Sequence, residues 1–152
     1  GPSLLAYPAM LLIDAPSVQA YPREAVIAEK LEAMVKLDIR NSRMKDFYDI
    51  WFISRAWPFN GQSLKRAIVA TFERRNTALP VGIPFALTDE FLMDPLKQSQ
   101  CQGFLRRLGL DKETPRLVDL GAALRDFLLP ALDIGDDKEM DWRPGGPWRP
   151  SS

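Results

Sequence analysis

Apolar residues recur three and four positions apart over most of the chain, the spacing that places side chains on one face of an α-helix. Proline interrupts this pattern where helices are expected to begin or end, since Pro22 fits a first helical position and Trp57-Pro58 stops a helix. The expected helices cover about 23–37, 43–56 and 63–75, a short segment capped by Thr88, the segment from Asp94-Pro95 to Gly109, and the segment from Thr114-Pro115 to about Pro130. The pattern therefore predicts a mainly α fold.

The beginning of the chain has a different pattern. An apolar stretch broken by Tyr7-Pro8 predicts one or two short strands, at about 4–6 and 10–13, on the edge of a sheet. A short strand pair does not form a stable sheet alone, so we expect its other strands to belong to a longer protein or to a second chain. The apolar residues that such a sheet would leave uncovered, and through which we expect self-association, are Leu4, Leu5, Met10, Leu11 and Leu12.

The end of the chain is polar and rich in proline and glycine, with Trp142 and Trp148 as the only anchors. We expect an extended tail there, either lying over the helices or loose. The chain is interpreted as one domain, 1–152, with strands and a loop at 1–21, a helical bundle at 22–132 and the tail at 133–152.

Composition excludes several kinds of chemistry. The chain has no histidine, which excludes Ser-His-Asp and Cys-His catalysis and histidine metal ligands. Its single cysteine, Cys101, excludes an intrachain disulfide and a Cys-x-x-Cys zinc site. No apolar run approaches the roughly 20 residues of a membrane span. Acidic and basic residues balance, so any contact with nucleic acid must come from a local patch.

The first expected helix carries a lysine inside its apolar stripe. Lys30 lies one turn from Val26 and one turn from Met34, whereas Glu29, Glu32 and Lys36 fall on the opposite, solvated face. Burying an ammonium without a partner costs several kcal/mol, so an inward-pointing Lys30 requires nearby carboxylates or phosphates.

The second expected helix supplies carboxylates. Asp46 and Asp49 stand three positions apart and share a face. If the short loop makes the two helices antiparallel, Lys30 and Asp49 lie at similar heights, about 9–11 Å from the turn, and Lys30 can reach either acid. Arg43 and Lys45, beside the start of the helix, add positive charge suited to phosphate.

A purely structural role also explains this pattern. Buried Lys–Asp pairs often only fix how two helices pack, and on pattern alone this structural role is the more frequent one. Arg74-Arg75 and Arg106-Arg107 are interpreted as solvated helix faces rather than RNA contacts, because no aromatic residue is interleaved with them. The aromatic residues interpreted as mostly core rather than as a base-stacking platform are Phe47, Tyr48 and Trp51.

The same residues carry a resemblance to a known family. The run from Tyr21 to Ala33, which contains Ala28-Glu29-Lys30, and the run from Asn41 to Asp49, which contains Arg43-x-Lys45-Asp46-x-x-Asp49, resemble the AbiEii/AbiGii nucleotidyltransferase toxins. The resemblance continues through 71–77 and reaches the Gly-Gly-Pro-Trp sequence at 145–148.

The resemblance implies the helical C-terminal half of an α+β, DNA-polymerase-β-like nucleotidyltransferase from a bacterial, cytoplasmic toxin–antitoxin or phage-defence system. In that family, an N-terminal Gly-Ser and an Asp-x-Asp pair bind Mg²⁺ and the nucleoside triphosphate (NTP). Carried over, Lys30 contacts the triphosphate, Asp46 is the acidic residue of the second helix, and Asp49 supports it. Arg43 and Lys45 lie close by. The implied partners are a cognate antitoxin and an acceptor, either tRNA or other RNA, or a protein.

This sequence departs from the family in one respect, since it contains neither Gly-Ser nor Asp-x-Asp. Nucleotidyl transfer needs such a carboxylate pair to hold Mg²⁺, so we expect the chain alone to be inactive and to bind neither Mg²⁺ nor NTP tightly. Three hypotheses follow: part of a nucleotidyltransferase, a helical module that binds an antitoxin or RNA without catalysis, or a Lys–Asp cluster that only locks two helices together.

Overall fold

The computed structural model describes residues 22–36 and 44–152. The strands expected at 4–6 and 10–13, and the apolar residues expected to drive self-association, lie outside this part and remain predictions. The described part is mainly helical, as expected. Its elements are α2 (Arg23–Lys36), α3 (Met44–Ala56), β1 (Phe59–Asn60), α4 (Gly61–Arg74), the 3₁₀ helix η3 (Phe85–Leu87), α5 (Asp89–Leu92), α6 (Pro95–Arg107), α7 (Leu117–Asp133), β2 (Met140–Trp142) and β3 (Trp148–Pro150).

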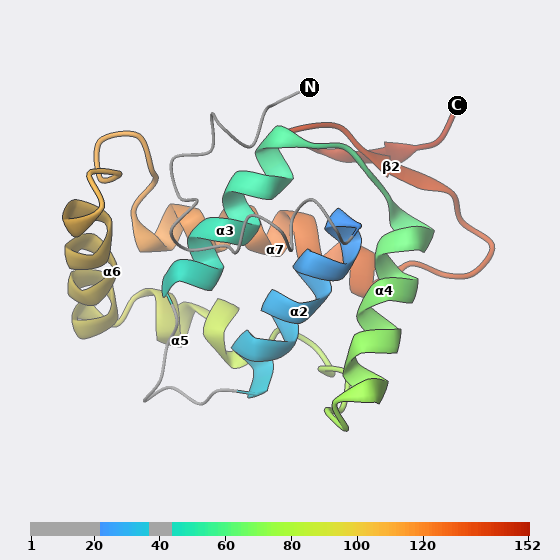
Figure 1. Ribbon diagram of the computed structural model, residues 1–152, viewed down its shortest axis with the longest axis horizontal. Helices are drawn as coiled ribbons and strands as arrows, with labels where there is room; N and C mark the ends of the chain where they lie inside the picture. The colour runs from blue at the N-terminus through green and yellow to red at the C-terminus, as the bar shows by residue number, and fades with distance from the viewer. Residues whose placement is uncertain (1–21, 37–43) are drawn as a thin grey trace.

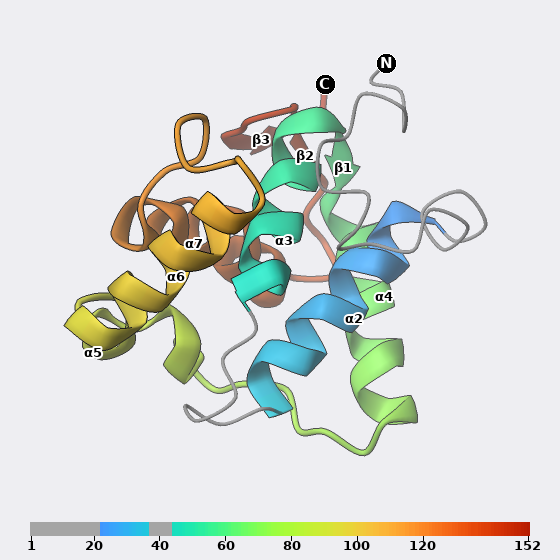
Figure 2. The same cartoon turned by 60° about the vertical axis from the view of Figure 1, so that its left-hand side comes forward.

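Helix α2 lies between α3 and α4, and α7 passes behind them (Figure 1). Helices α2 and α3 run in opposite directions, while α5 and α6 lie at the far end of the molecule from α4 (Figure 2). The core between these helices consists of fully buried aliphatic and aromatic side chains. Its largest members on α2, α3, α4 and α7 are Ile27, Leu31, Phe47, Ile50, Ile53, Leu64, Ile68, Phe72 and Phe127.

Side chains cap the starts of α4, α5 and α6; the starts predicted at Thr88 and Asp94-Pro95 are confirmed, whereas α4 begins at Gly61, two residues before the expected start. Asn60 Oδ1 accepts a hydrogen bond from the Ser63 amide at 3.0 Å and opens α4. Thr88 caps α5, and Asp94 caps α6 with Pro95 in the first turn. These short polar side chains satisfy amide groups that have no partner inside the helix.

Helix α7 differs from the prediction at both ends. It begins at Leu117 instead of Pro115, and it continues through Pro130 to Asp133. A proline inside a helix removes one amide donor, here the one that would bond the Asp126 carbonyl. Both residues are exposed, so water can bond that carbonyl and the helix tolerates Pro130.

The C-terminal tail is folded onto the helices, where its strands β2 and β3 join β1 in a small antiparallel sheet of order β1-β2-β3. Phe59 pairs with Trp142, and Trp142 pairs with Trp148. The Trp142 indole donates to the Ser54 carbonyl at 2.7 Å, and the Trp148 indole donates to the Phe127 carbonyl at 2.8 Å. Of the two alternatives for the tail, it therefore lies over the helices, anchored by the two tryptophans.

No helix in the described ranges has the length and apolar character that crossing a bilayer demands.

Candidate functional site

Helix α2 has two buried faces because it is covered by a different helix on each side. Lys30 points from one face toward α3, where its side chain is 13% exposed. Glu32 is only 1% exposed and reaches residues at the end of α4. A charged side chain on each face of α2 therefore meets a charged or polar group on a neighbouring helix.

The Lys30 amine lies between two buried carboxylates of α3. Its Nζ is 3.0 Å from Asp49 Oδ2, an ion pair, and it donates a 3.4 Å hydrogen bond to Asp46 Oδ1. The side chains of Asp46 and Asp49 are 1% and 0% exposed. The structure thus brings together the three residues that the sequence placed on facing helices.

Local sequence explains why this cluster is sheltered. Val26 and Met34, one turn before and after Lys30, are both buried, so the lysine lies within an apolar stripe. On α3, Ile50 and Ile53 are buried on the face that carries the two acids. Opposite charges attract each other more strongly in such apolar surroundings than in water. Removing one member of the cluster therefore leaves a buried charge without compensation.

A second charged cluster, in which the buried Glu32 contacts the partly exposed Arg75 and Thr77, was not expected from the sequence, and the prediction that Glu32 belongs to a solvated face is wrong. Arg75 Nη1 lies 3.2 Å from Glu32 Oε1, and Thr77 donates a 3.0 Å hydrogen bond to Glu32 Oε2. Arg75 also lies 3.8 Å from the half-exposed Glu29, which Arg74 approaches at 3.6 Å. A helical wheel identifies one buried face, and the second face becomes apparent only when α4 packs against it.

The remaining predicted site residues are less well defined. Arg43 lies outside the described residues. Lys45 is in the first turn of α3, next to Asp46 in the sequence, and is partly buried. Arg74, Arg75, Arg106 and Arg107 are exposed, as expected for solvated helix faces, although Arg75 also contacts the buried Glu32.

A resident metal ion does not fit the acidic residues of 22–36 and 44–152. These ranges contain no group of three or more Cys, Asp and Glu side chains arranged to hold one. Asp46 and Asp49 form a pair that already contacts the Lys30 ammonium. Two carboxylates that face an ammonium do not make the oxygen-rich site that Mg²⁺ prefers.

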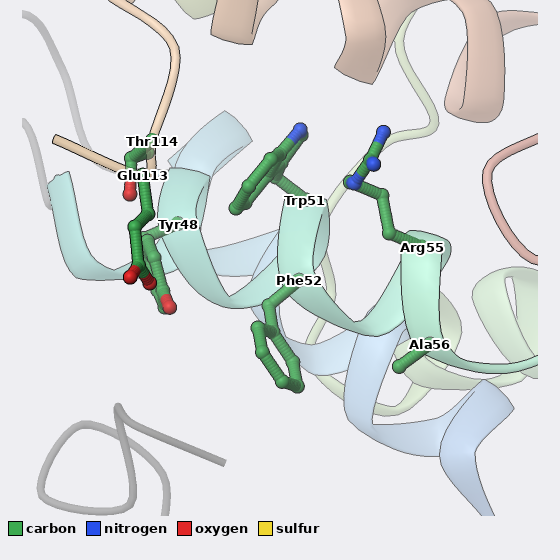
Figure 3. A pocket seen from close by; sticks show the side chains of 7 residues that line it. All are labelled: Tyr48, Trp51, Phe52, Arg55, Ala56, Glu113 and Thr114. Carbon is green, nitrogen blue, oxygen red and sulfur yellow. The ribbon is translucent and has the colours of Figure 1, made fainter. Parts of the chain in front are cut away.

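The opposite face of α3 is aromatic. Tyr48, Trp51 and Phe52 project from this face, Arg55 lies beside Trp51, and Glu113 lies beside Tyr48 (Figure 3). A cavity of about 190 Å³ lies among them. The Arg55 guanidinium is 5.3 Å from the centre of the Trp51 ring, a distance typical of a cation–π contact.

These aromatic residues are mostly core, as expected: two are buried, and Trp51 is partly buried and packs against the core. Phe47 is 1% exposed and stacks on Phe91 at 5.8 Å, and Tyr48 is also buried. Trp51 is partly buried and lines the cavity.

Among the described residues, Tyr48 and Cys101 have a pKa raised by their surroundings. Burial raises the pKa of the Tyr48 phenol to about 12, with smaller contributions from the negative charges of Asp49 and Glu113. Burial alone raises the pKa of the Cys101 thiol to about 11. Cys101 is therefore protonated near neutral pH and is unsuited to act as a nucleophile.

Comparison with known proteins agrees with the resemblance seen in the sequence. A family model described as nucleotidyl transferase AbiEii toxin, type IV TA (toxin–antitoxin) system, matches residues 2–128. The match includes Lys30, Asp46, Asp49 and the Glu32 cluster, but it ends before the Gly-Gly-Pro-Trp sequence at 145–148. No curated protein and no solved structure matches the chain significantly. Since the family model matches most of the chain, this protein belongs to the AbiEii family of nucleotidyltransferase toxins of type IV toxin–antitoxin systems.

Proposed function

We propose that this chain forms the helical part of an enzyme that transfers a nucleotide from an NTP to an acceptor, and that Lys30 contacts the triphosphate. The observation that supports this role is the position of the Lys30 amine, which is 3.0 Å from one buried carboxylate and 3.4 Å from another while 13% of its side chain stays exposed. A lysine held in place before the substrate arrives loses little freedom on binding.

The proposed chemistry of Lys30 is electrostatic. Negative charge on the phosphate oxygens is redistributed in the transition state of nucleotidyl transfer, and a fixed ammonium in a sheltered place stabilises it. Asp46 and Asp49 on α3 hold the Lys30 amine in place. In this proposal Asp46 is the acidic residue of the family motif, and Asp49 supports it. Lys45, in the first turn of α3, and Arg43, which precedes α3 in the sequence, would add positive charge near the phosphates.

Mg²⁺ and the NTP belong to the complete enzyme in this proposal. Mg²⁺ would neutralise phosphate charge there, bound by an Asp-x-Asp pair that this sequence lacks. We therefore expect residues 1–152 alone to be inactive, and to become active when a polypeptide with Gly-Ser and Asp-x-Asp completes the site.

A cognate antitoxin is the partner that the family implies. The acceptor in our proposal is an RNA, such as tRNA, or a protein. The alternative function, a helical module that binds the antitoxin without catalysis, is favoured by one observation. Several large apolar side chains between the end of α4 and the start of α6 are exposed, namely Leu79, Val81, Ile83, Phe85, Met93 and Leu96.

Complementation tests the proposal. The chain is incubated with Mg²⁺, each labelled NTP and candidate RNA acceptors, alone and together with an N-terminal half from another family member. Label transferred only in the combined reaction supports the proposal. Tight antitoxin binding with no transfer in any combination supports the alternative.

A further inference from the structure

We propose that Arg75 and Thr77 are positioning residues. By binding the Glu32 carboxylate they fix the rotation of α2 about its axis and thereby hold Lys30 against α3. This role rests on the proposed function only for its importance in catalysis, because the contacts themselves lie within this chain.

The geometry of α2 links the two clusters. Glu32 follows Lys30 by two positions, and successive residues of an α-helix turn by about 100°, so the two side chains leave α2 in nearly opposite directions. Their rise along the axis differs by about 3 Å. The contacts of Glu32 with α4 and the contacts of Lys30 with α3 therefore lie at almost the same height, on opposite faces of α2.

The end of α4 forms a hydrogen-bonded turn that positions the side chains of Arg75 and Thr77. The Thr77 amide donates to the Phe72 carbonyl at 2.9 Å, and the Asn76 amide donates to the Glu73 carbonyl at 3.1 Å. Asn76 has a left-handed φ of 55°, which asparagine tolerates better than most residues. These bonds form a Schellman motif, a common way to end a helix. Phe72 is buried and anchors the motif in the core.

Both oxygens of the Glu32 carboxylate accept a hydrogen bond. Arg75 contacts Oε1 and Thr77 donates to Oε2, so the carboxylate is fixed in orientation as well as in position. Without these partners a buried carboxylate lacks compensation, and a rotation of α2 that brings Glu32 toward water becomes favourable. The same rotation moves Lys30 away from Asp46 and Asp49.

The neighbouring Arg74 offers a matched control. It lies one position away and also contacts a glutamate of α2, Glu29, at 3.6 Å. Both side chains of that pair are substantially exposed, at 60% and 39%. Such a pair contributes little to orientation, because water competes for both charges.

The test measures the reactivity of the Lys30 amine in the folded chain, without nucleotide, metal or partner. Acylation by a small amine-reactive reagent is followed by mass spectrometry, and the Lys30 rate is divided by that of Lys36, an exposed lysine on the same helix. Circular dichroism confirms that each variant is folded at the labelling temperature.

We expect Arg75→Gln and Thr77→Val to raise the Lys30/Lys36 ratio several-fold. Arg74→Gln leaves the ratio unchanged, and Thr77→Ser, which keeps the hydroxyl, restores the low value. If Arg75→Gln does not fold, Thr77→Val decides, because it keeps the shape of the side chain. A ratio that stays at the wild-type value in a folded Thr77→Val overturns the proposal, even if its melting temperature falls. This result does not depend on nucleotide transfer, so failure of the proposed function leaves it intact.

Discussion

The Lys30 ammonium and the Asp49 carboxylate lie 3.0 Å apart on facing helices, and the carboxylate is fully buried. Since Asp46 contributes a second contact at 3.4 Å, α2 and α3 are joined by charge as well as by apolar packing. The pair thus has a structural consequence whether or not it also meets a substrate.

Removing one member of this cluster should reduce stability strongly. Asp49→Ala leaves Lys30 with weaker compensation in a sheltered place, and we expect a loss of about 3 kcal/mol in the free energy of unfolding. Urea denaturation measures this loss. The exposed Asp119 on α7 supplies the control, because Asp119→Ala should change stability by less than about 0.5 kcal/mol. Equal effects of the two substitutions would contradict the burial of the pair.

The sequence predicted this cluster because helical periodicity is a local property. Lys30 interrupts an apolar stripe, Asp46 and Asp49 share a face, and both facts can be read within one helix. The Glu32 cluster could not be predicted in the same way. Its burial depends on α4 packing against the second face of α2, which the spacing along α2 does not reveal.

The sheet and the end of α7 show the same limit. Strand β1 has two residues, and its partner Trp142 lies more than 80 positions away, so no local alternation predicted the pairing. The Pro130 stop signal was wrong because Asp126, one turn earlier, is an exposed residue, so its carbonyl can bond water instead. The capping residues Thr88 and Asp94 gave correct starts, because a cap acts within a few residues.

Alkaline pH should destabilise the protein through Tyr48. Its pKa is raised to about 12 in the folded chain, whereas the ordinary value is 10.0. Below pH 10 the phenol is neutral in both states, so its contribution is fully present. Above pH 10 only the unfolded chain ionises, and this contribution is lost as the pH approaches 12. The loss is about 2 kcal/mol.

Comparison with Tyr48→Phe isolates this effect, because the variant cannot ionise at that position. Urea midpoints measured between pH 9 and 11.5 should fall more steeply for the wild type than for Tyr48→Phe. Parallel curves would show that Tyr48 is not shielded from water as the structure indicates.

The turn between β2 and β3 should tolerate a side chain at one glycine but not at the next. Gly145 and Gly146 have similar left-handed φ angles, 86° and 80°. A Cβ at Gly145 would meet no atom within 4 Å, whereas one at Gly146 would collide with the Trp142 ring. Gly145→Ala should therefore cost about 1 kcal/mol of backbone strain. Gly146→Ala should cost about 1–3 kcal/mol more, from overpacking.

Thermal denaturation followed by tryptophan fluorescence compares the two variants. The emission of Trp142 should also shift in Gly146→Ala, because its ring must move. Equal losses of stability in the two variants would show that Trp142 does not pack over Gly146.

Transfer of labelled nucleotide by the chain, completed with an N-terminal half that carries Gly-Ser and Asp-x-Asp, tests most directly whether Lys30 acts on the substrate. Lys30→Met removes the charge and keeps much of the apolar length of the side chain, while Lys36→Met makes the same change at an exposed position of α2. We predict that Lys30→Met lowers the transfer rate by at least about 100-fold, the scale of losing one electrostatic contact in a transition state, while the variant stays folded and Lys36→Met keeps the wild-type rate. A folded Lys30→Met variant that transfers nucleotide at the wild-type rate would contradict the account and leave Lys30 with a structural role.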